Sequence, residues 1–238
     1  LVLAGAGSGK TRVLTTRIAN LISRRGIPPQ SILAVTFTNK AAGEMRDRVH
    51  RLLGEAPIGM WLGTFHGLGA RFLRQHSPLL GWTSRFSIFN SQDSARLVKS
   101  TAKSIGLDTA RWSPKIIAHK LSDLKNNLVS PQQYLEENGD GLDIFKRKIS
   151  EIYPRYQTAL KDQNAFDFDD LLVKPVEILR SNDGLLRAYQ NKFKFLLVDE
   201  FQDTNNAQIQ FLRLLSHGHE NLMVVGDDDQ SIYGWRGA

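Results

Sequence analysis

Five short apolar runs, separated by segments with helical spacing, constrain the fold of this 238-residue chain more than any other feature. They cover residues 1–4, 32–36, 60–64, 195–199 and 222–226. Continuous apolar runs of this length, rich in β-branched and aromatic residues, predict strands that are buried on both faces, as in parallel sheets. Between them, two sets of apolar residues each share a helix face: Leu14, Ile18, Leu21 and Ile22, and Ala41, Met45, Val49 and Leu52. The alternation predicts a doubly wound α/β layer.

The middle of the chain follows a different pattern. From about residue 90 to residue 163, apolar residues recur at helical spacing only, in stripes such as Ala95, Val98, Ala102 and Ile105, and Phe145, Ile149, Ile152 and Tyr156. Because strand-like runs resume at Phe195, we expect one α/β domain interrupted by an all-helical inserted domain. The expected division is residues 1–88, residues 89–163 for the insertion, and residues 164–238.

Composition narrows the classes of function. The chain has no cysteine, which excludes disulfides, thiolate metal sites and cysteine nucleophiles, and it has no apolar run long enough to span a membrane. A cytoplasmic location is therefore the expectation. The formal net charge is +7, with the positive excess in residues 1–80 and an acidic excess in residues 166–238. This distribution favours a polyanionic partner for part of the chain.

A glycine-rich loop lies directly between the first apolar run and the first helical segment. It reads Ala4-Gly5-Ala6-Gly7-Ser8-Gly9-Lys10-Thr11. Glycines let backbone N–H groups and the helix N-terminus point at phosphate oxygens, a lysine adds positive charge, and a hydroxyl can bind magnesium. The pattern indicates a nucleotide-phosphate site, although Ala4 stands where the usual pattern has glycine. A glycine-rich turn without a ligand is the alternative.

Two acids follow the fourth apolar run. At the carboxyl end of a parallel strand, Asp199 would face the ligand-binding crevice and could hold magnesium. Glu200 is then placed to orient and deprotonate a water that attacks the terminal phosphate. A solvated turn is the alternative explanation of this Asp-Glu pair.

The glycine-rich loop and the Asp199-Glu200 pair belong to an ordered series of segments along the chain. The segments after the loop are Ala34-Val35-Thr36-Phe37-Thr38-Asn39-Lys40-Ala41-Ala42, Gly63-Thr64-Phe65-His66, Phe166-Asp167-Phe168-Asp169-Asp170-Leu171, Asp199-Glu200-Phe201-Gln202-Asp203-Thr204-Asn205, and residues 225–238 from Val225 to Ala238. The series resembles the superfamily 1 DNA helicases of the UvrD/Rep type from one end of the chain to the other. The resemblance implies a RecA-like P-loop NTPase sheet with helices on both faces and the helical insertion.

The resemblance also implies roles for individual residues. Residues 4–11 would hold ATP and Mg²⁺, with Lys10 on the phosphates and with Thr11 and Asp199 on the metal. Arg12 would lie beside the nucleotide base, Glu200 would serve hydrolysis, and Gln230 would sense the γ-phosphate. Single-stranded DNA would contact Phe37, Thr64, His66, Tyr233, Trp235 and Arg236. Aromatic faces and cations suit a protein that must hold any base sequence, because stacking tolerates every base.

Several side chains keep two interpretations. Phe65 is expected in the core, and Asp227, Asp228 and Asp229 are expected to cap a helix and hold Gln230 rather than to bind metal. Basic residues lie in segments that should approach DNA phosphates: Lys40, Arg46, Arg71 and Arg74. Others would add duplex contacts or form a solvated helix face: Lys99, Lys103, Lys115, Lys120 and Lys125.

The leading hypothesis is an ATP-dependent DNA helicase or translocase, moving 3′ to 5′ by resemblance. Its expected partners are single-stranded DNA, single-strand/duplex junctions and proteins of repair or replication. We interpret the chain as an N-terminal fragment that lacks the family's second motor domain and does not unwind DNA alone. The helicase portion of a helicase–nuclease, or a non-catalytic DNA-binding relative, are the alternatives.

Overall fold

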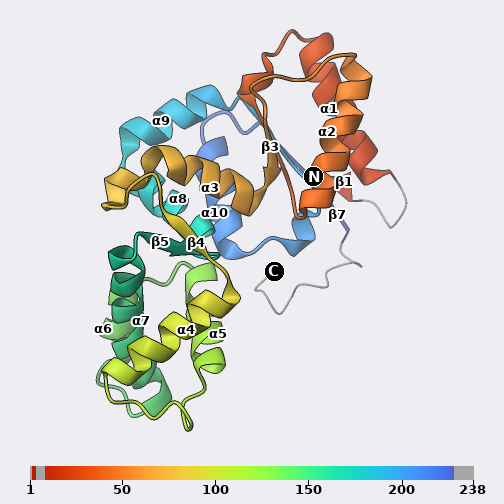
Figure 1. Cartoon of the computed structure of the whole chain (residues 1–238). Coiled ribbons are helices and arrows are strands. Elements are labelled where there is room, and N and C mark those ends of the chain that lie inside the picture. Colours follow the sequence, from red (N-terminus) through yellow and green to blue (C-terminus); the bar gives the residue numbers. More distant parts are fainter. Residues whose placement is uncertain (1, 4–8, 228–238) are drawn as a thin grey trace. The chain divides into compact units, whose positions relative to one another are not determined.

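The structure is a computed structural model that describes residues 2–3 and 9–227 (Figure 1). Its contacts divide the chain into two compact units, one made of Leu1–Gly69 with Leu179–Ala238 and the other of Ala70–Ile178. The boundaries fall inside two helices, α3 (Phe65–His76) and α8 (Asp170–Ser181). The second unit therefore extends beyond the predicted insertion at both ends.

The first unit contains a five-stranded parallel sheet. The strand order is β1-β7-β6-β2-β3, with every described neighbouring pair parallel. The strands are β1 (Val2–Leu3), β2 (Ile32–Thr36), β3 (Trp61–Thr64), β6 (Phe195–Val198) and β7 (Leu222–Gly226). Each lies within one of the predicted apolar runs, so the prediction of a parallel α/β sheet is confirmed.

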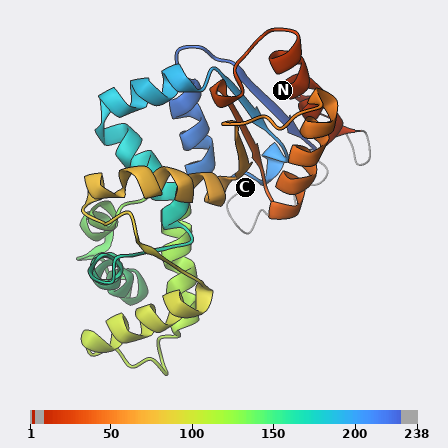
Figure 2. The same cartoon turned by 45° about the horizontal axis from the view of Figure 1, so that its top comes forward.

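Helices cover both faces of this sheet (Figure 2). On one face, Leu14 and Ile18 of α1 (Lys10–Ser23) and Met45 and Val49 of α2 (Asn39–Leu53) share a buried core with the strands. On the other face, Trp61 contacts the Tyr189 and Phe193 rings, and α10 (Asn206–Ser216) packs near β6. Tyr189 belongs to α9 (Asp183–Lys192). Residues of β2 that point to either face are fully buried, which explains why the run is apolar throughout.

Leu52 of α2 belongs to the apolar stripe predicted from the sequence but not to the core. Leu52 is 51% exposed, whereas Leu53 packs against the buried cluster. The buried stripe is centred on Ala42, Met45 and Val49, and Leu52 lies at the edge of that stripe in the last turn. Gly54 then ends the helix in the left-handed conformation.

The second unit contains four whole α-helices, parts of α3 and α8, and a small sheet. The whole helices are α4 (Ser91–Ser104), α5 (Pro114–Asn126), α6 (Pro131–Asn138) and α7 (Ile144–Asp162). Val98, Ala102, Ile149 and Ile152 lie in their shared core, as their helical spacing predicts. Two short parallel strands, β4 (Ser87–Phe89) and β5 (Ala165–Asp167), belong to the same unit and were not predicted. Among the described residues, no helix is both long and apolar enough to cross a membrane.

A buried ionic cluster joins α5 to β5 and α8. The Lys125 ammonium lies 2.6 Å from an Asp167 oxygen and 2.9 Å from an Asp170 oxygen, and its side chain is 1% exposed. The Tyr156 hydroxyl donates to Asp167, and the Asn126 amide donates to Asp169. The expectation that Lys125 contacts DNA or solvent is therefore wrong, because this ammonium is enclosed by carboxylates in the core of its unit.

The protonation of this cluster follows from burial and charge. Burial alone would lower the pKa of Lys125, but Asp167 and Asp170 raise it well above its usual value. The pKa of Asp169 is also raised, to about 6, because burial and the Asp167 carboxylate both disfavour its charged form. The ammonium thus stays charged while one neighbouring carboxyl titrates close to neutral pH.

We predict that Lys125→Met destabilises the protein by about 3–5 kcal/mol at pH 8, because it leaves buried carboxylates without their cation. The loss should shrink at pH 5, since carboxyls with raised pKa values take up protons and become neutral as the pH falls. Chemical denaturation at both pH values measures this, with exposed Lys99→Met as the matched control. Equal stability of the two variants would contradict the structural role of Lys125.

Candidate nucleotide-binding edge of the sheet

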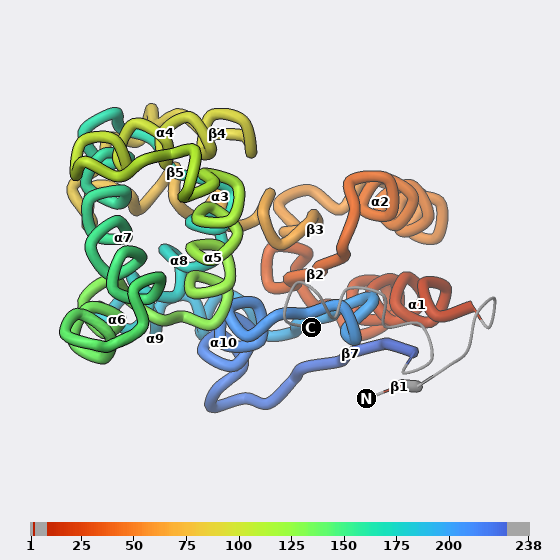
Figure 3. Tube along the Cα trace, turned by 90° about the horizontal axis from the view of Figure 1, so that it is seen from below, coloured from red at the N-terminus to blue at the C-terminus, as the bar shows by residue number. Residues whose placement is uncertain are grey.

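The parallel arrangement brings the ends of several strands and the start of α1 to one edge of the sheet. The carboxyl ends of β2, β3, β6 and β7 lead into Phe37, Phe65, Asp199 and Asp227, and α1 begins at Lys10 beside them. In such sheets, ligands bind at this edge. Figure 3 shows the β2, β3 and β7 strands with α1 and α2 beside them. Residues that are far apart in the sequence therefore meet here.

Lys10 begins α1 and is held by a buried carboxylate. Gly9 precedes it with φ 88°, a left-handed conformation that glycine adopts without steric cost. The Lys10 ammonium lies 2.9 Å from an Asp227 oxygen, and both side chains are less than a tenth exposed. The backbone N–H groups in the first turn of α1 have no acidic side chain near them in sequence. This helix start thus combines an ammonium with the positive end of a helix dipole.

Thr11 and Asp199 are brought together from opposite ends of the chain. The Thr11 hydroxyl donates to an Asp199 carboxylate oxygen at 3.2 Å. Burial raises the pKa of Asp199, and the Glu200 carboxylate raises it further. A hydroxyl and a carboxylate at this spacing are the hard oxygen ligands that Mg²⁺ prefers. No group of three or more acidic or histidine side chains suited to a metal occurs in the described part of the chain.

Gln202 organises the two neighbouring acids. Its amide nitrogen donates to a Glu200 oxygen at 2.8 Å, and its amide oxygen accepts from the Asp227 backbone N–H at 3.0 Å. Glu200 itself has φ 53°, an uncommon conformation for a residue with a side chain. Backbone strain of this kind persists where surrounding contacts hold it. The sequence assigned no role to Gln202 and did not pair Asp227 with Lys10.

Three of the predicted DNA-contacting residues, Phe37, Thr64 and His66, lie in the described part of the chain. Phe37 and His66 are partly exposed at the same edge of the sheet. Thr64 is buried, and its hydroxyl accepts from the Gly67 backbone N–H at the start of α3. Phe65 is 4% exposed, so its predicted core position is confirmed. Arg12 is exposed on the first turn of α1.

The other predicted site residues lie outside the described part of the chain. They are Ala4, Gly5, Ala6, Gly7 and Ser8 of the phosphate loop, and Gln230, Tyr233, Trp235 and Arg236. Two basic residues expected near DNA have structural partners. Arg74 donates to the Ser84 and Phe86 carbonyls, and Arg46 donates to the Leu62 carbonyl.

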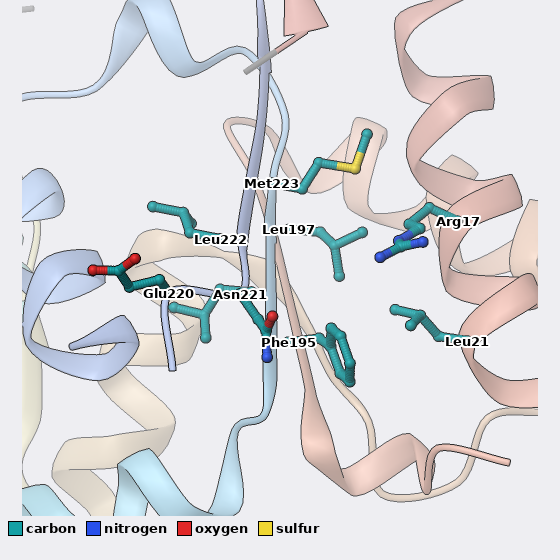
Figure 4. Close-up of a pocket in the computed structure, with 9 residues that line it drawn as sticks. Arg17, Leu21, Phe195, Leu197, Glu220, Asn221, Leu222 and Met223 are labelled. Atoms are coloured by element: carbon teal, nitrogen blue, oxygen red, sulfur yellow. The ribbon is translucent and has the colours of Figure 1, made fainter. Parts of the chain in front are cut away.

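A pocket of about 200 Å³ lies at the other end of the same strands (Figure 4). Phe195, Leu197 and Met223 face Arg17 and Leu21 of α1 across it. Phe195 begins β6 and Leu222 begins β7, so this pocket is at the amino ends of the strands. None of the predicted site residues lines it.

A parallel α/β sheet with a lysine, a hydroxyl and adjacent acids at its carboxyl edge defines a class of nucleotide-phosphate-binding protein. A family model for the UvrD/REP helicase N-terminal domain matches residues 1–238, and the chain belongs to this family. It is 46% identical over 246 aligned residues to the ATP-dependent DNA helicase UvrD1 of Mycobacterium tuberculosis. It is 43% identical to the ATP-dependent DNA helicase PcrA of Staphylococcus epidermidis and 42% identical to that of Staphylococcus aureus.

These relatives are much longer than the chain. Each alignment covers 100% of the chain but 32% of the relative. The chain therefore spans about a third of the length of the curated helicases it matches.

We predict that Asp227→Asn destabilises the nucleotide-free protein by about 3 kcal/mol, because it leaves the buried Lys10 ammonium without its counter-charge. The exposed Asp140→Asn should change stability by less than about 0.5 kcal/mol. Urea denaturation of both variants checks this. An Asp227→Asn protein as stable as the control would show that the ion pair contributes nothing to folding.

Proposed function

We propose that the chain is the ATP-binding portion of an ATP-dependent DNA helicase or translocase. The observation that carries the proposal is the meeting of Lys10 and Thr11 with Asp227 and Asp199 at one edge of a parallel sheet. The relatives that the chain matches are named as ATP-dependent DNA helicases. From the family resemblance, we further propose that the full-length protein moves 3′ to 5′ along single-stranded DNA.

In this proposal the phosphates of ATP lie against residues 4–11 and the N-terminus of α1. Lys10 leaves Asp227 to pair with the phosphates, which offer stronger negative charge. Thr11 and Asp199 hold Mg²⁺, which neutralises charge on the phosphate oxygens when it is bound. Two protein oxygens suffice for this ion, because magnesium usually completes its shell with waters and substrate phosphates. Arg12 would lie beside the base.

Glu200 is the proposed general base for the attacking water. The Gln202 amide donates to one Glu200 carboxylate oxygen at 2.8 Å, and a carboxylate oriented in this way can accept the proton of the water. The bond from water oxygen to the γ-phosphorus forms as the bond from phosphorus to the leaving oxygen of ADP breaks. Gln230 is the proposed sensor of the γ-phosphate.

Single-stranded DNA is the proposed second partner, with duplex junctions beside it. Phe37, Tyr233 and Trp235 would stack on bases, while Thr64, His66 and Arg236 would position the strand. Helices α4–α7 correspond to the proposed inserted domain, and the exposed Lys99, Lys103 and Lys115 would face duplex phosphates. Repair or replication proteins are the proposed protein partners.

We predict that Glu200→Gln lowers DNA-stimulated ATP turnover of the full-length protein by about 10²–10⁴-fold, because the amide cannot take a proton. Binding of a fluorescent ATP analogue should be retained. Glu220→Gln, at the opposite end of the same sheet, is the matched control and should keep normal turnover. Wild-type turnover by Glu200→Gln would disprove the assigned role, and the absence of ATPase activity in the wild type would disprove the proposed function.

We predict that Trp235→Ala weakens single-stranded DNA binding by about 5–150-fold, which corresponds to the loss of one stacked base. Trp235→Phe keeps an aromatic face and should lose less than half of that binding free energy. Fluorescence anisotropy with a labelled oligonucleotide measures both variants. Unchanged affinity of Trp235→Ala would remove this residue from the DNA site, while nucleotide binding serves as the folding control.

A further inference from the structure

Thr36, the last residue of β2, carries a buried hydroxyl in a strand that is otherwise apolar. Its side chain is 0% exposed, and its hydroxyl has no hydrogen-bond partner in the described part of the chain. Burying an unpaired hydroxyl opposes folding, and valine would fill nearly the same volume without that penalty. The four preceding residues of the strand, Ile-Leu-Ala-Val, are all apolar. The hydroxyl at this position therefore calls for a partner connected with function.

The position of Thr36 follows from side-chain alternation. Ile32 and Ala34 pack in the core beneath α1 and α2, so Thr36 lies on the same face of the sheet. The same argument applies to Thr64 after Leu62, and to Asp199 after Leu197. Asp227 follows Val225 in the same way. These side chains form one polar row on neighbouring strands, in the spatial order Thr64, Thr36, Asp199 and Asp227.

The register places Thr36 between its two neighbours in the row. Thr36 is paired directly with Thr64 of β3. On the other side, Val35 pairs with Val198, and the Asp199 backbone N–H donates to the Val35 carbonyl at 2.9 Å. Neighbouring strands lie about 4.8 Å apart, so short side chains at adjoining positions come within reach of a direct hydrogen bond once a hydroxyl rotates.

The hydrogen-bonding capacities of the row are complementary. The Thr64 hydroxyl accepts from the Gly67 N–H, so its own proton is available for donation. The Asp199 carboxylate can only accept while it is ionised. A hydroxyl between them can accept from Thr64 and donate toward Asp199, which is what a threonine supplies and a valine does not.

We propose that Thr36 is a positioning residue that couples the nucleotide edge to the segment assigned to DNA. When nucleotide binds, its hydroxyl rotates to accept from Thr64 and to donate to Asp199. A change at Asp199 is then passed to Thr64 on one side and to Phe37, the next residue in the chain, on the other. This proposal rests on the proposed function, because it assumes nucleotide at one end of the polar row and DNA at the other.

The test compares Thr36→Val, which removes the hydroxyl, with Thr36→Ser, which keeps it. In the full-length protein, the affinity for a labelled single-stranded oligonucleotide is measured with and without a non-hydrolysable ATP analogue and Mg²⁺. Coupling between two sites is typically worth about 5–150-fold in affinity. We expect a ratio in this range for the wild type and Thr36→Ser, and a ratio within about twofold of one for Thr36→Val.

Folding and nucleotide binding are the accompanying controls. Thr36→Val should melt at or above the wild-type temperature and bind the analogue within about twofold of the wild type. Thr36→Ala, which also lacks the hydroxyl, should lose coupling in the same way and serves as the second variant if Thr36→Val does not fold.

The outcomes separate the two proposals. A wild type that binds both ligands, with a hydroxyl-free variant that keeps the full ratio, overturns the role of Thr36 and leaves the proposed function intact. A ratio of one in the wild type overturns it as well. A wild type that binds neither nucleotide nor DNA overturns the proposed function itself.

Discussion

The parallel direction of all five strands is the constraint on which the rest of the first unit depends. Because every strand ends at the same edge, Lys10, Thr11, Asp199 and Asp227 meet although they come from opposite ends of the sequence. The same geometry explains the continuous apolar runs, since both faces of the sheet are covered by helices. An antiparallel pairing of any one strand would move its terminal side chain to the far edge, where the pocket at Phe195 and Met223 lies.

Two buried lysines have different surroundings and therefore different proposed roles. Lys125 is enclosed by two carboxylates, and a tyrosine hydroxyl and an amide bind the acids around it. Its charge is matched within its own unit, and an arrangement with so many partners resists exchange. Lys10 pairs with the Asp227 carboxylate at 2.9 Å, at the sheet edge proposed to bind nucleotide. The phosphates of a nucleotide carry more negative charge than the Asp227 carboxylate, which suits the role proposed for Lys10.

Sequence patterns predicted the elements that depend on long-range burial and missed those that depend on particular contacts. The runs at Ile32–Thr36 and Leu222–Gly226 are strands because only buried parallel strands are apolar on both faces. The strands β4 and β5 have three residues each, too few for a period to appear, and β4 is largely exposed. Lys125 was misplaced because a lysine on a helix gives no sign in the sequence of the aspartates 42 and 45 residues away.

At the site, residue types could be predicted but not their partners. The segment from Asp199 to Asp203 indicated two acids at a strand end, and the structure adds that Gln202 holds Glu200 and the Asp227 backbone together. A Cβ at Gly226 would lie 2.8 Å from the Gln202 amide oxygen, so a larger residue there would displace this side chain. One amide thus fixes the strained Glu200, whose φ is 53°, to the strand that carries the partner of Lys10. The proposed general base and the residue that pairs with Lys10 are therefore positioned by the same Gln202 side chain, so neither can be displaced without disturbing the other.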